Sequence, residues 1–412
     1  MFNISAIMKS KDVTSRDIPY YVRALAMGLP AICFGLTIQT WLRLPSIVKS
    51  GFLDFRHLYT AGYLLRSGYA SELYDVSVQK FWQNTLISPF PQLLPFNHPA
   101  YEAILFAPLS FLNYREGFVV FFAANLAMLW FCFRWLKGKF TVLEYAWPLL
   151  PVSLFIGFVP LSATLIQGQD SILLLALFIL AWKSLKSDEL RAGLFLGLGI
   201  FKFHIVLPVA ALFFLWNRKR FIVGFLGSSA FCLLISVWIT GAHGILQYAE
   251  IIRRMNDPDM FSFEPRLMPN LRGLANMLLG GRIPFLNIWI VFCSIVVFAA
   301  VALWHPRDIS DRFLTTTVLV SLISYHVLAH DLSLLLLPIA VMANYYLSTG
   351  DFGRLGIVAA AFCGAALVAI SPSVFPLAAV ADLFFLIAIC TTNTDCVIET
   401  DTTVRESLMQ NA

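Results

Sequence analysis

Long apolar runs separated by short polar gaps extend through most of the chain. A membrane-spanning helix needs about 20 mostly apolar residues, and most of the runs approach that length. The pattern therefore predicts an all-α fold, a polytopic transmembrane helical bundle. The runs that could span a bilayer are 24–44, 117–136, 141–161, 169–183, 190–216, 221–240, 284–304, 312–328, 331–347, 355–371 and 374–391.

Basic residues predict how these runs thread the membrane, because short cytoplasmic loops concentrate Lys and Arg. Five basic clusters can share the cytoplasmic side on two conditions. Segment 100–113, whose alternatives are a crossing or an interfacial helix, must not cross, and 190–216 must cross twice as a helix pair broken around 201–204. The clusters are the amino terminus, Arg134/Lys137/Lys139, Lys183/Lys186/Arg191, Arg218/Lys219/Arg220 and Arg307/Arg312.

This threading gives about 12 crossings with both termini inside. The chain is then one integral-membrane domain, 1–412, with a cytoplasmic tail at 393–412. Two long segments, 45–116 and 241–283, fall on the outer face, and every inner loop is short. We therefore expect the chemistry on the outer face.

Composition excludes an ordinary soluble domain. The 412 residues are 59% hydrophobic and only 13% charged, against roughly 25% charged in soluble chains. The net charge of +5 is small and bears on orientation, so nucleic acid is not indicated as a partner. Six of the seven cysteines lie in apolar runs, and we find no disulfide framework or metal spacing.

Ionisable side chains in a spanning segment cost a few kcal/mol on insertion scales, so each needs a partner, a watery cavity or a function. In the predicted threading they gather at the outer face, and this convergence is the main indication of a site. The polar residues concerned are Asp54, Glu102, Gln167, Gln169, Asp170, Lys202, His204, His326, His330 and Asp331.

Three aspartates at the outer face each have two interpretations. Asp54, beside Arg56 and His57, could be a general base that deprotonates an attacking hydroxyl, or a helix cap or loop ion pair. Asp331 and Asp170 each precede an apolar run, where a carboxylate is favoured simply as an N-terminal cap.

The cationic candidates suit a phosphate. Lys202 and His204 could bind one where it meets the hydrocarbon, although a snorkelling lysine is the alternative. Arg272, in the second outer segment, suits a phosphate or anionic lipid. His326 and His330 have i, i+4 spacing and share a helix face, but two ligands without a third are a weak metal signal.

Several strings resemble glycosyltransferase family 87, the polyprenyl-phosphate-mannose-dependent α-mannosyltransferases and their bacterial relatives. The resemblance covers about 45–340 and departs at Asn97-His98, where the family often has a Tyr-Pro-Pro-like string, and at Asp170, where Asn or Val is common. These departures bear on the acceptor and the sugar. The strings are Asp54-Phe55 through Gly68, Leu73-Tyr74-Asp75, Asn97-His98-Pro99, Pro108-Leu109, Gly168-Gln169-Asp170, Lys202-Phe203-His204, Leu207-Pro208, Leu271-Arg272-Gly273, Ser324-Tyr325-His326, His330-Asp331-Leu332 and Leu337-Pro338.

The resemblance implies a GT-C type membrane enzyme in a bacterial plasma membrane, with its active site on the extracytoplasmic face. A hexose, with mannose as first candidate, would pass with inversion from a polyprenyl-phosphate donor to a glycan or glycolipid acceptor, with Asp54 as the base. Lys202, His204 and Arg272 would hold the donor phosphate. No cofactor is implied and no metal ligand assigned, although a divalent metal stays open. The substrate pocket would comprise Arg56, His57, Tyr59, Tyr74, Gln169, Asp170, His326, His330 and Asp331.

Two other functions remain open at this stage. A transporter or flippase of lipid-linked sugars usually shows a duplicated half with interrupted helices and short loops on both sides, whereas this chain has one interrupted pair and long outer loops. An O-antigen-like polymerase or ligase would share the lipid phosphate and the outer loop. It would lack the Asp54-Phe55 string close to the first helix.

Overall fold

The computed structural model describes residues 18–254, 264–280, 282–304 and 308–392. Regular structure in these ranges is helical throughout, with no strand, so the all-α prediction is confirmed. The polar amino-terminal segment and the predicted cytoplasmic tail at 393–412 lie outside the described residues.

The described ranges contain seven helical segments long and apolar enough to span a membrane. A bent pair, Leu150–Gly157 and Val159–Gln167, would make eight, and two shorter apolar helices cover Ser171–Ser184 and Phe375–Cys390. The chain is therefore a helical membrane protein, and the count of about 12 crossings stays a prediction. The seven segments are Tyr20–Arg66, Tyr114–Lys139, Glu189–Leu215, Lys219–Arg254, Leu286–Leu303, Asp331–Thr349 and Phe352–Ile370.

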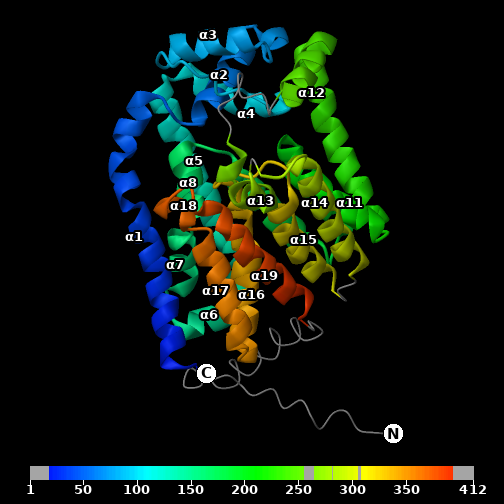
Figure 1. Cartoon of the computed structure of the whole chain (residues 1–412). Coiled ribbons are helices and arrows are strands. Elements are labelled where there is room, and N and C mark those ends of the chain that lie inside the picture. The colour runs from blue at the N-terminus through cyan, green and yellow to red at the C-terminus, as the bar shows by residue number, and fades with distance from the viewer. Residues whose placement is uncertain (1–17, 255–263, 281, 305–307, 393–412) are drawn as a thin grey trace.

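Short helices of the first outer segment gather at one end of the bundle. Figure 1 shows α2, α3 and α4 there, at the end opposite the start of α1. Residues 100–113, which were predicted not to cross, form only brief helical turns. The elements are α1 (Tyr20–Ser50), α2 (Phe55–Arg66), η3 (Ala70–Glu72), α3 (Val76–Leu86), η4 (Ala100–Glu102), α4 (Ala103–Phe106) and η5 (Pro108–Phe111).

The predicted break around 201–204 is a 3-10 turn between two helices. The run consists of α10 (Glu189–Leu198), η7 (Gly199–Lys202) and α11 (Phe203–Leu215), and α12 (Lys219–Arg254) follows. Glu189 at the start of α10 accepts a hydrogen bond from Arg218 just after α11, at 3.1 Å. A straight run of 27 residues would hold these ends about 40 Å apart, so the chain reverses direction at η7.

Small residues let α10 and α12 lie against each other. A Cβ added at Gly193 would stand 1.9 Å from the carbonyl oxygen of Phe221, and one at Gly224 would stand 2.0 Å from that of Leu190. Such close helix contacts through small residues are typical of membrane interfaces. Further along, α12 kinks at Gly241, where the second outer segment was predicted to begin.

The remaining helices complete the bundle around a core formed by α9, α15 and α16, which have mostly buried side chains. By contrast α14 is largely exposed and apolar, as expected of a lipid-facing helix. The bounds are α5 (Tyr114–Leu136), η6 (Lys137–Lys139), α6 (Thr141–Ala146), α7 (Leu150–Gly157), α8 (Val159–Gln167), α9 (Ser171–Ser184), η8 (Pro265–Leu267), α13 (Leu271–Leu279), α14 (Leu286–Leu303), α15 (Ile309–Ile323), η9 (Asp331–Leu335), α16 (Leu336–Thr349), α17 (Phe352–Gly364), α18 (Leu367–Ile370), η10 (Phe375–Leu377) and α19 (Ala378–Cys390).

Candidate active site

A polar cavity of about 330 Å³ lies where α2, α9, α11, α13 and η9 begin. It brings together residues that are far apart in sequence, including most of the predicted site. Its lining comprises Asp54, His57, Leu93, Leu94, Pro95, Asn97, His98, Gln169, Phe201, Lys202, Phe203, His204, Ile252, Arg272, Tyr325, His326, Leu328, His330 and Asp331.

Asp54 presents its carboxylate to this cavity. Gln169 Nε2 donates a hydrogen bond to Asp54 Oδ2 at 2.9 Å, and His330 Nδ1 lies 4.0 Å from the same oxygen. His330 Nδ1 is also 2.8 Å from Gln167 Oε1. The Asp54 side chain remains 27% exposed, so an incoming hydroxyl can reach it.

Gly168 makes the approach of Gln169 to Asp54 feasible. It adopts a left-handed conformation with φ +66°, and an added Cβ would stand 2.7 Å from the Cβ of Phe55. Glycine is the residue that tolerates both the positive φ and this closeness. The end of α8 therefore lies directly against the start of α2.

The helix-cap interpretation does not describe any of the three aspartates. Asp54 and Asp170 precede α2 and α9 respectively, yet neither side chain accepts a capping hydrogen bond. Asp331 instead accepts from the backbone N–H of Leu328, which precedes it, at 2.9 Å. The contacts of these three carboxylates must therefore be explained by something other than helix capping.

Lys202 is the central cation of a buried cluster. Its Nζ lies 2.5 Å from Asp331 Oδ1, 2.8 Å from Ser171 Oγ and 3.2 Å from Asp170 Oδ1. Lys202 donates hydrogen bonds to Asp331 and Ser171, whereas its contact with Asp170 is an ion pair without a hydrogen bond. Lys202 thus contributes positive charge to the cavity wall, while its direct contacts are within the protein.

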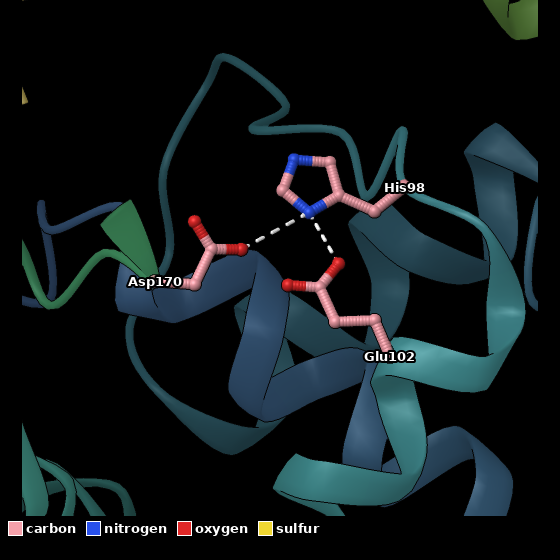
Figure 2. A group of neighbouring side chains, drawn as sticks. All are labelled: His98, Glu102 and Asp170. Atoms are coloured by element: carbon pink, nitrogen blue, oxygen red, sulfur yellow. Dashed lines mark hydrogen bonds and ion pairs between the residues drawn. The ribbon is translucent and has the colours of Figure 1, made fainter. Parts of the chain in front are cut away.

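His98, Glu102 and Asp170 extend this cluster. Figure 2 shows the His98 ring turned so that Nδ1 faces both carboxylates, one of which, Asp170, lies 3.4 Å away, while Glu102 makes a still shorter contact. Burial would lower the pKa of His98, but the two carboxylates outweigh it and raise that pKa to about 10. Burial likewise raises the pKa of Glu102 to about 8, against the opposing effect of His98.

The raised pKa values favour the protonated forms of His98 and Glu102, and with both groups protonated the buried cluster carries no net charge. Lys202 and His98 are then positive, Asp170 and Asp331 negative, and Glu102 uncharged. The ligand atoms of His98, Glu102 and Asp170 also lie within 4.8 Å of one another and could hold a metal ion. Within the described part of the chain, His326 and His330 do not belong to such a group of three.

Arg272 and two histidines line another part of the cavity. The Arg272 guanidinium stacks 3.7 Å above the ring of Tyr325 and donates to the Tyr325 carbonyl at 3.0 Å. The rings of His204 and His326 meet edge to face with centroids 5.9 Å apart. Asn270 caps α13 and also donates to the Ser324 carbonyl, which fixes Arg272 next to these rings.

Four predicted pocket residues do not line the cavity: Asp170, which lies in the buried cluster around Lys202, and Arg56, Tyr59 and Tyr74. Arg56 is fully buried and donates to Gly51, Gln83, Asn84 and Ser88, which joins α2 to α3. Tyr59 donates to the Leu112 carbonyl and Tyr74 to the His98 carbonyl, each at 2.7 Å. Arg56, Tyr59 and Tyr74 thus support α2, α3 and the His98 loop.

His98 and Ser171 were not among the predicted site residues, and Glu102 was predicted only as one of the polar residues that gather at the outer face. His98 and Glu102 have i, i+4 spacing, so this spacing was an available signal for their contact. Asp170, in contrast, approaches them only through the tertiary fold, as does Ser171.

A family model described as glycosyltransferase family 87 matches residues 96–329, which is more than half of the chain. The matched segment includes His98, the Gly168 turn, Lys202, Arg272 and His326. The matched segment begins after Asp54 and α2. The family match therefore gives no information about Asp54, and its surroundings are known here only from the structure. No curated protein and no solved structure matches the chain.

Proposed function

The chain belongs to glycosyltransferase family 87, and we propose that it transfers a hexose, with mannose as first candidate, from a polyprenyl-phosphate donor to a glycan or glycolipid acceptor. Family membership makes it a membrane glycosyltransferase. The donor, the acceptor and the catalytic residues are the proposal, which places the reaction on the extracytoplasmic face of a bacterial plasma membrane.

The position of Asp54 is the observation that carries the proposal. Among the carboxylates that line the cavity, Asp331 is paired with Lys202 and 3% exposed. Asp54 is 27% exposed, and none of the described cationic side chains is in hydrogen-bond contact with it. A general base must accept a proton from a substrate group within hydrogen-bond reach. The exposed carboxylate of Asp54 is open to such a group, and the hydrogen bond from Gln169 orients it, which supports this role.

In the proposed reaction, Asp54 accepts the proton of an acceptor hydroxyl. The hydroxyl oxygen attacks the anomeric carbon as the bond from that carbon to the phosphate oxygen breaks. The electron pair of this bond leaves with the lipid phosphate, and the proton passes from Asp54 to solvent or to the released phosphate. Direct displacement inverts the anomeric centre, so a β-linked donor gives an α-linked product.

The leaving phosphate needs positive charge near the cavity. Arg272 is the cation whose guanidinium lines the cavity, and a guanidinium forms strong paired hydrogen bonds with phosphate. The charges of Lys202 and His98 are balanced by Asp170 and Asp331 in the cavity wall, so the phosphate contact is assigned to Arg272. His57 and His204 each have a buried Nε2 atom that finds no hydrogen-bond partner among the described residues, which suits contacts to sugar hydroxyls.

The test is sugar transfer by the Asp54→Asn variant. The amide keeps an oxygen for the Gln169 hydrogen bond but cannot act as a base, so we expect turnover to fall by about 10²- to 10⁴-fold. Membranes carrying the full-length chain are given polyprenyl-phosphate-mannose, and the new glycosidic product is measured. Glu72→Gln, an exposed carboxylate-to-amide change in the same outer segment, is the matched control and should keep its activity.

Unchanged turnover in Asp54→Asn would refute Asp54 as the base. Movement of the labelled sugar lipid across a vesicle without a new glycosidic bond would refute the transfer reaction itself.

A further inference from the structure

Aromatic side chains of the first outer segment meet around Trp82, on α3. The centroid of the Trp82 ring lies 4.9 Å from that of Tyr63, 5.5 Å from that of Tyr69 and 5.2 Å from that of Phe81. Phe81 is 59% exposed and Tyr69 is 38% exposed, although both side chains are large and aromatic. The cluster therefore lies at the surface, with rings open to a ligand.

Arg66 joins this cluster to Phe111. Its guanidinium lies 5.2 Å from the ring centroid of Tyr63 and 4.5 Å from that of Phe111. Within the described part of the chain Arg66 donates two hydrogen bonds, both to Ser110, although a guanidinium has five N–H groups. We name the six side chains the aromatic platform: Tyr63, Arg66, Tyr69, Phe81, Trp82 and Phe111.

The helix α3 buries amides and exposes rings, which is the reverse of an ordinary surface helix. Gln79 and Gln83 are each 1% exposed, and Phe81 lies on the opposite side of the helix. Gln79 Oε1 accepts a hydrogen bond from the Phe96 N–H at 2.8 Å, and Gln83 Nε2 donates to the Leu94 carbonyl at 2.6 Å. Because amides attach α3 to the protein, its packing does not explain the exposed rings.

The length of α1 places the platform beyond the hydrocarbon core of the bilayer. The 31 residues of α1 make it about 46 Å long, whereas the core is about 30 Å thick. The predicted apolar run ends at residue 44, so α2 and α3 follow outside that core. Figure 1 shows α3 farther from the start of α1 than α2 and α4. Lipid tails are therefore not the partner expected for these rings.

The exposed area suits a small ligand. At about 200 Å² for each side chain, Tyr69, Phe81 and Phe111 together expose about 350 Å². A stable protein interface needs about 800 Å² on each partner. Apolar patches of a few hundred Å² are often functional on a monomer, and the platform has this smaller size.

The combination of rings and N–H donors matches the chemistry of a carbohydrate. The C–H groups on the face of a pyranose ring are apolar and stack on aromatic rings, while its hydroxyl groups project from the ring edge. A sugar stacked beside Tyr63 has the N–H groups of Arg66 next to its hydroxyls. A purely apolar ligand would not use these donors.

We propose that the aromatic platform is a carbohydrate-binding subsite, which holds sugar units of a glycan acceptor that are remote from the reacting hydroxyl. The acceptor role rests on the proposed function, whereas carbohydrate binding does not. Leu94, Pro95 and Asn97 line the polar cavity, and Gln83 attaches this loop to α3. The platform and the cavity are thus separated by little more than one helix diameter, about 10–12 Å, which is within the length of a short oligosaccharide.

The first experiment measures binding of free oligosaccharides to the full-length protein in nanodiscs, with no sugar donor present. Mannotetraose, maltotetraose, cellotetraose and chitotetraose are titrated by calorimetry. Trp82→Ala removes the centre of the platform, and Phe81→Ala, at an exposed position, is the second variant in case the first fails to fold. Tyr145→Ala is the matched control, because Tyr145 is 45% exposed on α6, at the other end of the bundle.

We expect saturable binding of at least one tetrasaccharide. Both platform variants should weaken that binding at least about tenfold, because each removes apolar area that the bound sugar would cover, and the control should leave it unchanged. No saturable binding of any of the four sugars, or equal binding by platform and control variants, would overturn the inference.

Kinetics test the acceptor role. The platform variants should raise KM for the tetrasaccharide acceptor at least about tenfold, with little change in kcat. KM for a monosaccharide glycoside should stay unchanged, because one sugar bound in the cavity cannot also reach the platform. Equal losses of kcat for both acceptors would show that the rings act only on the fold, and would overturn the inference.

Two further results separate this inference from its alternatives. The fluorescence of Trp82 is obtained by subtracting the signal of Trp82→Phe from that of the wild type, and its quenching by brominated lipid tails would place the platform in lipid and overturn the inference. Platform-dependent binding of a tetrasaccharide, in a wild-type protein that transfers sugar to no acceptor, would instead refute the proposed function and leave the carbohydrate subsite standing.

Discussion

Replacing Lys202 by Met should destabilise the protein strongly, because it leaves two buried carboxylates without their cation. Lys202 Nζ lies 2.5 Å from Asp331 and 3.2 Å from Asp170, and all three side chains are no more than 3% exposed. At an effective dielectric constant of 20, each contact at about 3 Å corresponds to about 5 kcal/mol of Coulomb energy. Desolvation in the wild type and protonation in the variant offset much of this, so we expect a net loss of about 3–5 kcal/mol.

The assay is unfolding in mixed micelles of dodecyl maltoside and sodium dodecyl sulfate, followed by tryptophan fluorescence. Lys186→Met is the matched control, because Lys186 also forms a close ion pair, 2.6 Å from Asp308, but is 39% exposed. An exposed pair contributes only about 0–1 kcal/mol. The difference between the two variants therefore measures the effect of burial.

A double variant tests whether the loss comes from the unpaired charge. Adding Asp331→Asn to Lys202→Met removes one of the two orphaned carboxylates and keeps an oxygen for the Leu328 N–H. We expect the double variant to be more stable than Lys202→Met alone. Two results would refute the buried-cluster explanation. One is a loss of unfolding free energy in Lys202→Met no larger than in Lys186→Met, and the other is a double variant whose loss equals the sum of the losses of its two single variants.

Three further predictions concern the surroundings of this cluster. His98 and Glu102 both have raised pKa values in the folded protein, about 10 and about 8, so the folded state binds more protons than the unfolded state and its stability should fall as pH rises from 7 to 10. Glu102→Gln should flatten that fall in thermal unfolding, and a variant with the wild-type pH profile would contradict this explanation. Gly168→Ala should lower both stability, by about 1–3 kcal/mol, and sugar transfer, because a Cβ at φ +66° would meet Phe55 beside Asp54; wild-type unfolding and turnover would refute the tight turn. Sugar transfer should survive chelation with EDTA, because protons already neutralise the cluster, whereas one tightly retained divalent ion per chain, absent from Glu102→Gln, would assign a metal site to His98, Glu102 and Asp170.

The bundle and the place of the site could be predicted because lipid makes polar side chains costly. Apolar runs of sufficient length identify the helices, and the bias of basic residues predicts one side as cytoplasmic. The remaining few ionisable groups were therefore predicted near helix ends on the opposite side of the membrane. Asp54, Gln169 and His330 do meet at one cavity, although they come from three separate parts of the chain.

The partners of each side chain could not be predicted in the same way. Arg56 stands beside Asp54 in sequence, yet α2 turns it to the opposite side, where it joins α3. Helical periodicity allows either direction, and the choice depends on packing in three dimensions. Lys202 was predicted as a phosphate ligand. In the structure it is surrounded by Ser171, Asp170 and Asp331, because α9, α11 and η9 begin close together, and this arrangement depends on the tertiary fold.

The contrast between Asp54 and the buried cluster explains how one small region can hold several carboxylates and still have one of them available as a base. In a low-dielectric site, two neighbouring carboxylates without cationic partners would repel each other. This repulsion would raise the pKa of one of them, which would then hold a proton. Lys202 and the protonated His98 together prevent this by balancing Asp170 and Asp331. Asp54 stays outside that network, linked to it through neutral Gln169 and His330. Its carboxylate can then accept a proton without the charge of the whole cluster changing.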